Sequence, residues 1–493
     1  MPVLVEIRPT ARLRGRNAVD LTAVLAPVLG ALTTDTDGDG PPPDLSRLRV
    51  VADWVQYRDN FRTAVELRPV VGGARLELAL DLRRITGAEP DDVTSAVGAA
   101  LHAHRTGASS AGEVTLEEWG PTSRSLIWAF NSLYWQHLQL WEEATGRGYE
   151  SALPGGQSDA RHTDPVRETI GKLFAIWDSL AGRRALPEEL YVVELGVGNG
   201  NQARTWLDTF VEMDRAHGRE YYRRLHYLMC DYSPHVLELA RATVCGHSEH
   251  VSSFVLDALR PMTSLGFLRF KVFFVYISNV YDNLPTDEIA TIGQREHLVE
   301  SRAYLSGTDA TAIAATVGIE RDRLHVLVEK LLRLGPALLA EAAPRHFADV
   351  PAAVEFWRAC WKAVKLQERY VPLHGLDTYE IAPGISGELL RPLLATGGDV
   401  RMHVSNGAAT SFAETLPLLH PYGRLQCHDI VVTDPQRYRD GFRGPGKYDG
   451  SVVNWVNGPL LAHIGARKGF DVSFAPFQRT GSNIITMTAD VRD

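Results

Sequence analysis

Cysteine is scarce in this 493-residue sequence, and positive charge is not in surplus. Its cysteines, at positions 230, 245, 360 and 427, are far apart and form no CxxC pair. This spacing argues against a disulfide framework or a zinc site and favours a reducing cytoplasm. Lysine and arginine number 51 against 60 aspartates and glutamates, a formal net charge of −9. We therefore expect no metal site and no net basic field for binding nucleic acid.

Long apolar runs are also missing. The most apolar stretch, residues 272–280, has the length of a strand and falls short of the ~20 residues that a membrane span needs. The first residues lack a basic segment followed by an apolar one, so we expect no signal peptide. Hydrophobic residues make up 45% and charged residues 23%, which is typical of globular proteins. The sequence predicts a cytoplasmic globular protein with no membrane or nucleic-acid partner.

The length predicts about three folding units at roughly 150 residues each. Residues 1–105 have the strand-like alternation and the amphipathic helix of a small α+β domain. Residues 106–112 have the composition of a linker. Residues 113–190 are expected to form a helical lead-in. Within it, residues 125–145 are dense in aromatic side chains, which we expect to pack in the core, with a ligand cage as the alternative.

From residue 191 to residue 493 we expect a single α/β domain. Apolar strands are predicted at 191–195, 225–230, 251–256 and 270–277, with helices between them. Strands that are apolar on both faces and joined by helices predict a parallel, doubly wound sheet. The pattern resumes with a strand at 424–432, a helix at 452–467 and a closing antiparallel pair at 470–477 and 484–491.

Residues 286–420 interrupt this alternation, and we expect them to be a mostly helical insertion. They follow the fourth strand at the carboxyl edge of the sheet, where open α/β sheets bind ligands. Residues 324–332 carry an apolar helix face that must be buried. The insertion is therefore expected to be a lid over the site or a contact in a homodimer.

The first strand of the α/β domain ends in a glycine turn, Glu194-Leu195-Gly196-Val197-Gly198-Asn199-Gly200. Glycines at alternate positions let a ligand approach the backbone. A dinucleotide site uses G-x-G-x-x-G, but Asn201 stands in the place of its third glycine. With an acid two residues before the first glycine, the turn instead suits S-adenosylmethionine, whose ammonium Glu194 can neutralise.

Acidic residues follow the next two strands as well. Asp231 and Tyr232 follow the second strand, where a carboxylate can accept hydrogen bonds from both ribose hydroxyls. Asp257 and Ala258 follow the third strand, where a carboxylate can accept a hydrogen bond from the adenine amino group. Either aspartate alone can be a helix N-cap, so the prediction depends on the ordered set. Asn201, directly after the glycine turn, and Asn279, after the fourth strand, complete the predicted cofactor site.

With these motifs, residues 190–285 and 423–491 resemble a class I S-adenosylmethionine-dependent methyltransferase. The resemblance implies the seven-stranded sheet of that superfamily. Tyr281-Asp282-Asn283-Leu284-Pro285 is similar to the Phe-Asp-Ala-Leu-Pro motif after strand four of the MidA-like family. That family includes the mitochondrial protein-arginine methyltransferase needed for complex I assembly. It usually has Asn-Glu before the motif's aromatic pair, whereas this chain has Ser278-Asn279 and lacks the acid.

Three residues are candidates for catalysis. Asp282 and Tyr281 follow strand four beside the expected methyl position, and Asp282 is the candidate base or orienting group, with a turn cap as the alternative. His428, in strand five, is the third candidate, with a structural role as the alternative. The sequence predicts methyl transfer to an N or O acceptor on a protein, peptide or small molecule. A non-catalytic binding or assembly protein and a nicotinamide oxidoreductase are the competing interpretations.

Overall fold

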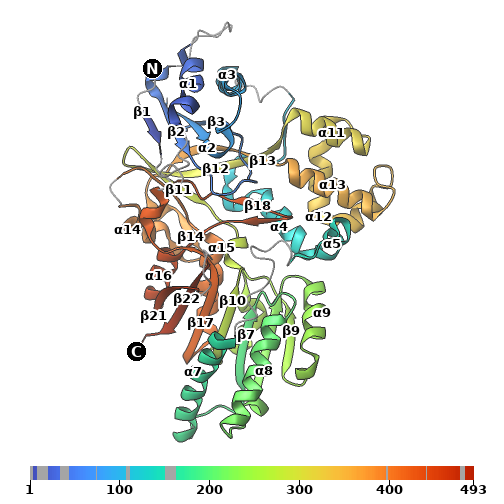
Figure 1. Ribbon diagram of the computed structural model, residues 1–493, viewed down its shortest axis with the longest axis vertical. Helices are drawn as coiled ribbons and strands as arrows, with labels where there is room; N and C mark the ends of the chain where they lie inside the picture. The colour runs from blue at the N-terminus through green and yellow to red at the C-terminus, as the bar shows by residue number, and fades with distance from the viewer. Residues whose placement is uncertain are drawn as a thin grey trace.

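The computed structural model describes residues 4–7, 20–33, 44–73, 75–106, 112–149, 163–395, 398–439, 441–477 and 484–492. The main sheet occupies the lower half of Figure 1, the N-terminal sheet lies at the top, and α4 and β18 lie between them. The linker predicted at 106–112 falls largely on residues 107–111, outside these ranges.

The main sheet contains the apolar strands that the sequence predicts. Its strand order is β21-β22-β17-β10-β7-β8-β9, and β20 pairs with β17 off this path. The bounds are β7 Leu190–Leu195, β8 Leu225–Asp231, β9 Val251–Val255, β10 Val272–Ser278, β17 Leu419–Val432, β20 Val456–Asn457, β21 Phe470–Pro476 and β22 Ile484–Val491. Pairing is parallel from β9 through β17 and antiparallel for β22 with both β17 and β21. The order reverses between β7 and β10, and the crevice at such a switch point is where α/β sheets bind ligands.

Helices cover both faces of this sheet, so the mixed α/β class is confirmed. Side chains at successive positions of β7 enter opposite cores: Val192 packs with α7 (Thr163–Gly182) and α8 (Asn201–Ala216), and Val193 packs with α15 (Asn406–Thr415) and α16 (Gly458–Arg467). The helix α9 spans Pro234–Thr243 and α10 spans Pro261–Leu265. The helix predicted from residue 452 begins instead at Gly458, because Asn457 caps it by accepting from the backbone N–H of Leu460.

The N-terminal residues form a four-stranded sheet with the order β1-β2-β4-β3. Its strands are β1 Leu4–Ile7, β2 Leu48–Asp53, β3 Val65–Pro69 and β4 Leu76–Asp81, and its helices are α1 Leu21–Thr33, α2 Leu82–Ile85 and α3 Pro90–Thr106. A separate apolar core joins α1 and α3 to this sheet. The sheet also touches the 286–420 segment, since the backbone N–H of Val71 donates to the carbonyl of Tyr370 (2.8 Å).

The 286–420 segment contains strands as well as helices, and the sequence predicted only the helices. It contains an antiparallel sheet of β13 Lys365–Pro372, β12 Arg295–Leu305, β11 Glu288–Ile292 and β16 Val400–His403. Short strands β5 Val114–Thr115 and β6 Gly120–Pro121 pair with β12, and β14 Glu380–Ala382 pairs with β15 Ile385–Ser386. The α-helices of the segment are α11 Gly307–Val317, α12 Leu324–Ala342, α13 Val350–Ala363, α14 Arg391–Leu394 and α15. Glu288, Glu368 and Arg401 are buried on these strands. Charged residues at buried positions hide the apolar alternation by which strands are predicted.

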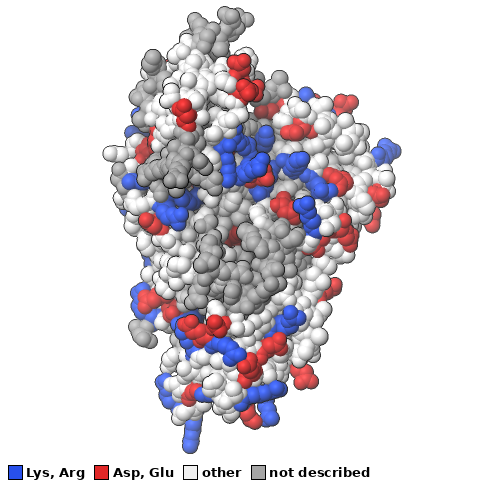
Figure 2. Space-filling model, in the orientation of Figure 1, with Lys and Arg blue, Asp and Glu red and all other residues white. Residues whose placement is uncertain are grey.

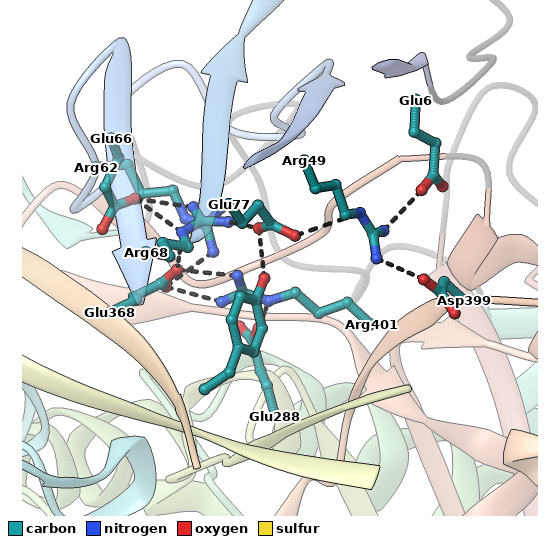
Figure 3. Close-up of polar contacts among 11 residues, drawn as sticks. Glu6, Arg49, Arg62, Glu66, Arg68, Glu77, Glu288, Glu368, Asp399 and Arg401 are labelled. Atoms are coloured by element: carbon teal, nitrogen blue, oxygen red, sulfur yellow. Dashed lines mark hydrogen bonds and ion pairs between the residues drawn. The ribbon is translucent and has the colours of Figure 1, made fainter. Parts of the chain in front are cut away.

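These buried charges form an ion-pair network between the N-terminal sheet and the 286–420 sheet (Figure 3). Arg68 pairs with Glu66 (2.8 Å), Glu77 (3.0 Å) and Glu368 (2.9 Å), and Arg401 pairs with Glu368 (2.8 Å) and with Glu288. Burial opposes ionisation of Glu368, but the neighbouring arginines lower its pKa below the ordinary value. Since each buried carboxylate has a cationic partner, the network ties two sheets distant in sequence into one unit.

The aromatic segment forms two helices that meet at His137. These are α4, Leu126–Gln136, and α5, Leu138–Thr145. They pack against α11, α12 and α13 in a second core, which also buries Leu324, Leu327 and Leu331. The apolar face predicted at 324–332 is thus buried against α4, α5 and the neighbouring helices. Strands β18 Gly446–Tyr448 and β19 Ser451–Val453 form a hairpin beside α4.

The face shown in Figure 2 carries acidic and basic side chains interspersed over its lower half, with a group of basic side chains above the centre. In the described part of the chain, no helix has both the length and the apolar character to cross a membrane.

Candidate functional site

A cavity of about 250 Å³ lies at the carboxyl ends of β7, β8, β9 and β10. The structure brings most of the predicted cofactor residues to its wall: Glu194, Gly196, Gly198, Asp231, Tyr232, Asp257, Ala258 and Asn279. Gly200 and Asn201 are not among the lining residues. Gly200 instead caps α8, and a Cβ there would meet the backbone of Ala240 at 2.9 Å. The glycine turn therefore has two roles: Gly196 and Gly198 line the cavity, and Gly200 allows close helix packing.

The turn depends on its glycines for conformation as well as for space. Gly196, Gly198 and Gly200 have φ angles of 76°, 56° and 79°, which side-chain-bearing residues rarely adopt. A Cβ at Gly196 would lie 2.3 Å from Val280, and one at Gly198 would lie 2.8 Å from the hydroxyl of Tyr149. The turn therefore lies in close contact with Val280, which follows β10, on one side and with Tyr149 on the other.

Burial raises the pKa of two carboxyl groups at the cavity wall. Glu194 is 2% exposed and accepts a hydrogen bond from the hydroxyl of Tyr227 (2.6 Å); burial raises its pKa to about 8. Asp231 accepts from the backbone N–H of Ser233 (3.0 Å) and of Gly198 (3.2 Å), and burial raises its pKa to about 6. A cationic or hydroxyl-bearing ligand stabilises the ionised form of such groups. These two carboxyl groups therefore fit a cofactor that has an ammonium group and a ribose.

The opposite wall comes from α4, for which the sequence offered a ligand cage only as the alternative to packing in the core. Trp128, Asn131, Ser132 and Trp135 line the cavity at the i, i+3, i+4, i+7 spacing of one helix face. Tyr149 lines it as well. The sequence does contain a signal for this wall, because the polar residues Asn131 and Ser132 interrupt a segment that is rich in aromatic residues. This segment is divided: Phe130, Tyr134 and Trp141 pack in the core, while these other residues face the cavity.

The three predicted catalytic residues are not at the cavity wall. Tyr281 and Asp282 are buried beside the lining residues Val280 and Asn283. Asp429 Oδ2 accepts from the backbone N–H of Tyr281 (2.9 Å) and of Asp282 (3.3 Å). Burial raises the pKa of Asp282 to about 6. The expectation that these side chains border the site is corrected: the turn after β10 directs its neighbours into the cavity and turns Tyr281 and Asp282 inward.

His428 lies in a separate small cavity of about 30 Å³, whose other walls include Trp206, Tyr276 and Phe477. Its ring nitrogens contact Gln426 (2.8 Å) and Thr486 (3.0 Å), and burial lowers its pKa to about 4. A neutral imidazole held by two neighbours fits a structural role. The carbonyl of His428 still reaches the site indirectly, because it accepts from the backbone N–H of Asn279 (2.9 Å).

In the described part of the chain, the insertion that was expected to be a lid does not line the cavity. No described residue of the 286–420 segment or of the 441–457 loop is among its lining residues. The insertion packs behind α4 instead. The expectation of a helical lid formed by the insertion is therefore corrected, because α4 already occupies the position over the cavity. Residues 1–105 contribute none of the cavity lining that is described.

Residues 170–349 match a family model described as "Putative S-adenosyl-L-methionine-dependent methyltransferase". The match spans β7 to β10, with the glycine turn and the acids at the ends of the strands, and continues past the end of α12. The helix α4 lies before the matched region. No curated protein matches the sequence.

Solved structures with similar folds include two proteins from Burkholderia thailandensis. One, bound to S-adenosylhomocysteine, has 15% identity and a TM-score of 0.42, and the alignment covers 76% of this chain and 88% of that one. The other, an uncharacterized protein, has 13% identity and a TM-score of 0.41 over 76% and 87% of the two chains.

The family match and the cavity at the switch point together define the class of protein. The chain is a methyltransferase, and its cofactor is S-adenosylmethionine.

Proposed function

We propose that the chain transfers the methyl group of S-adenosylmethionine to a nitrogen or oxygen atom of a protein, peptide or small molecule. The observation that carries the proposal is a single cavity lined by the glycine turn, by Asp231 and Asp257 after successive strands, and by the polar and aromatic face of α4. When bound, the cofactor supplies an activated methyl group on a sulfonium. The chain's own residues then have to bind it, orient the acceptor and exclude water.

Each predicted cofactor residue has a role in this proposal. The carboxylate of Glu194 neutralises the ammonium of the cofactor, and the carboxylate of Asp231 accepts from the ribose hydroxyls. Asp231 is held for this task because the N–H groups of Gly198 and Ser233 fix both of its oxygens. Asp257 is exposed and lines the cavity, which suits an acceptor for the adenine amino group. Tyr232 accepts from Gln136 Nε2 (2.7 Å) and so links the ribose side to α4.

We also infer kinship with the MidA-like family from residues 281–285. The chain departs from that family's motif at four positions, Ser278, Asn279, Tyr281 and Asn283, and all of these except Tyr281 line the cavity. The free cysteines Cys230, Cys245, Cys360 and Cys427 suit the cytoplasm, where thiols stay reduced.

The test is methyl transfer from isotopically labelled S-adenosylmethionine in native lysate, read by mass spectrometry. We expect a labelled protein or metabolite that is absent when Asp231→Ala replaces the wild-type chain. A non-catalytic binding protein would bind the cofactor and label nothing. Failure to bind S-adenosylhomocysteine would contradict the proposal outright.

A further inference from the structure

Asn279 has a backbone conformation that residues with a side chain rarely adopt. Its φ angle is 52°, in the left-handed region, which glycine enters freely and asparagine only at some cost. Of the described non-glycine residues with a positive φ, Asn279 alone lines the cavity. Residues held in such conformations gather at functional sites. The backbone of Asn279 therefore points to a role for its side chain in the cavity.

The surrounding structure holds Asn279 in this conformation. Its backbone N–H donates to the carbonyl of His428 (2.9 Å), which ties it to β17. The turn that follows is tied to α4, because Asn131 Nδ2 donates to the carbonyl of Asn283 (2.9 Å). Asn131 Oδ1 in turn accepts from the backbone N–H of Val452 (2.9 Å). The side chain of Asn279 thus stands on a backbone that is fixed on both sides.

The side-chain amide of Asn279 is available to a ligand. The residue is half-buried and lines the cavity. Within the described part of the chain its Oδ1 and Nδ2 make no hydrogen bond, and neither atom is fully buried. An amide accepts a hydrogen bond at its oxygen and donates at its nitrogen. Asn279 can therefore bind a group in the cavity without first giving up a contact inside the protein.

The order of the strands places Asn279 beside the cofactor residues. Asp257, Asp231 and Glu194 lie at the carboxyl ends of β9, β8 and β7, which are neighbours in the sheet. In the roles proposed above, these ends hold the adenine, the ribose and the ammonium. The next strand after β7 is β10, and Asn279 directly follows it. The end of β10 is therefore left for the acceptor.

The acceptor side of the cavity has no base among its described residues. There α4 and the turn after β10 contribute only neutral polar side chains: Asn131, Ser132, Ser278, Asn279 and Asn283. A hydroxyl acceptor has to give its proton to a base as it attacks. An amine that is neutral at the working pH already has a lone pair and needs no base. This side of the cavity therefore suits a nitrogen acceptor.

We propose that Asn279 Oδ1 accepts a hydrogen bond from the N–H of a neutral amine and so orients its lone pair toward the methyl group. The proposal rests on the proposed function and narrows its acceptor to nitrogen. The lone pair of the nitrogen forms the new bond to the methyl carbon, and the electrons of the carbon–sulfur bond remain on sulfur. The positive charge passes to the nitrogen, which then loses a proton to water.

A carboxylate is the competing acceptor, because it too needs no base. Its negative charge would enter a cavity whose described lining contains three acids and no lysine, arginine or histidine. Burying an anion without a cationic partner costs free energy. The electrostatics of the lining therefore favour the neutral amine.

The test is methyl transfer by the full wild-type chain in native lysate, from S-adenosylmethionine with a deuterated methyl group. Mass-spectrometric fragmentation of the labelled product shows which atom carries the methyl group, because the exact mass of the smallest labelled fragment reveals nitrogen or oxygen. We expect nitrogen.

Two variants then locate the interaction. Asn279→Gly removes the amide and keeps the backbone conformation, which glycine adopts readily. We expect transfer at saturating S-adenosylmethionine to fall by about two- to tenfold, the range for one hydrogen bond, and the affinity for S-adenosylhomocysteine to stay at the wild-type value. Gln294→Gly is the matched control, because Gln294 has a φ of 64° in the exposed turn between β11 and β12. It should leave both measurements unchanged.

Three results would overturn the inference. One is a labelled methyl group on oxygen, and another is wild-type transfer by Asn279→Gly. The third is a loss of affinity for S-adenosylhomocysteine in Asn279→Gly with unchanged transfer at saturating cofactor, because Asn279 would then belong to the cofactor site. Any of these with a wild type that labels a product rejects this inference alone. A wild type that labels nothing rejects the proposed function, and this inference with it.

Discussion

Asp231 joins the glycine turn to the start of α9, since its two oxygens accept from Gly198 and Ser233. We predict that Asp231→Ala weakens binding of S-adenosylhomocysteine by a few kcal/mol, because hydrogen bonds from the ribose to a carboxylate are lost. Isothermal titration calorimetry measures the change. Asp434→Ala is the matched control, because Asp434 makes the same local contact, to the N–H of Gln436, on an exposed turn. Unchanged affinity in a folded Asp231→Ala variant would remove Asp231 from the site.

Glu194 gives the cofactor site a pH dependence with a defined sign. In the ligand-free protein burial raises its pKa to about 8, so the carboxyl is mostly protonated at pH 6. Pairing with the ammonium of S-adenosylhomocysteine favours the ionised form, so binding releases a proton below pH 8. We predict that affinity rises as the pH goes from 6 to 8. Calorimetry in buffers of different ionisation enthalpy detects the proton.

Glu194→Gln is the control for that titration. It cannot ionise, so the rise in affinity toward pH 8 should disappear, and only the part below about pH 7, from Asp231 with its pKa near 6, should remain. A wild-type affinity that stays constant between pH 6 and 8 would mean that Glu194 does not face the ammonium.

At the scale of elements, α4 connects the cavity to the rest of the chain. Asn131 links α4 to the turn after β10 and to β19 through the contacts described above. We predict that Asn131→Ala lowers the free energy of unfolding by about 1–3 kcal/mol, because the buried N–H of Val452 and the partly buried carbonyl of Asn283 lose their partner. Urea unfolding measures it, and Gln139→Ala, at an exposed position of α5, should change little. Equal effects of the two substitutions would contradict this account of α4.

The strands β7 to β10 of the main sheet could be predicted because they are apolar on both faces. The acids at their carboxyl ends could be predicted to lie together, because parallel strands end at the same edge of a sheet. Glu194, Asp231 and Asp257 meet at the cavity for that reason. The sheet in residues 286–420 could not be predicted, since Glu288 and Glu368 occupy inward positions where a strand pattern needs apolar residues. A ligand-binding role for α4 stayed only an alternative, because aromatic residues suit a core and a ligand wall equally well.

At the scale of the whole molecule, the ion-pair network joins the N-terminal sheet to the 286–420 sheet (Figure 3). Arg401 bonds both oxygens of Glu368 (2.8 and 2.9 Å) and also pairs with Glu288. We predict that Arg401→Ala lowers the free energy of unfolding by about 3–5 kcal/mol, because it leaves buried carboxylates without this partner. Denaturant unfolding measures the loss. Arg391→Ala, which removes an exposed pair with Glu388, should leave the unfolding midpoint unchanged.

The same network bears on the prediction that residues 1–105 form a small α+β domain of their own. Removing them would take away Arg62 and Arg68, both partners of the buried Glu368. We therefore expect a chain that begins near Gly112 to retain every described cavity residue and yet to unfold at lower denaturant concentration than the full chain. Equal stability of the two chains would show that the network contributes nothing to folding.

The measurement that tests the central claim most directly is calorimetric titration of the full wild-type chain with S-adenosylhomocysteine, alongside an identical titration with NAD. Glu194, the glycine turn, Asp231 and Asp257 line one cavity, and Asn201 stands where a dinucleotide site has its third glycine. We predict that one S-adenosylhomocysteine binds per chain and that NAD gives no binding heat. Binding of NAD in the absence of S-adenosylhomocysteine binding would contradict the account.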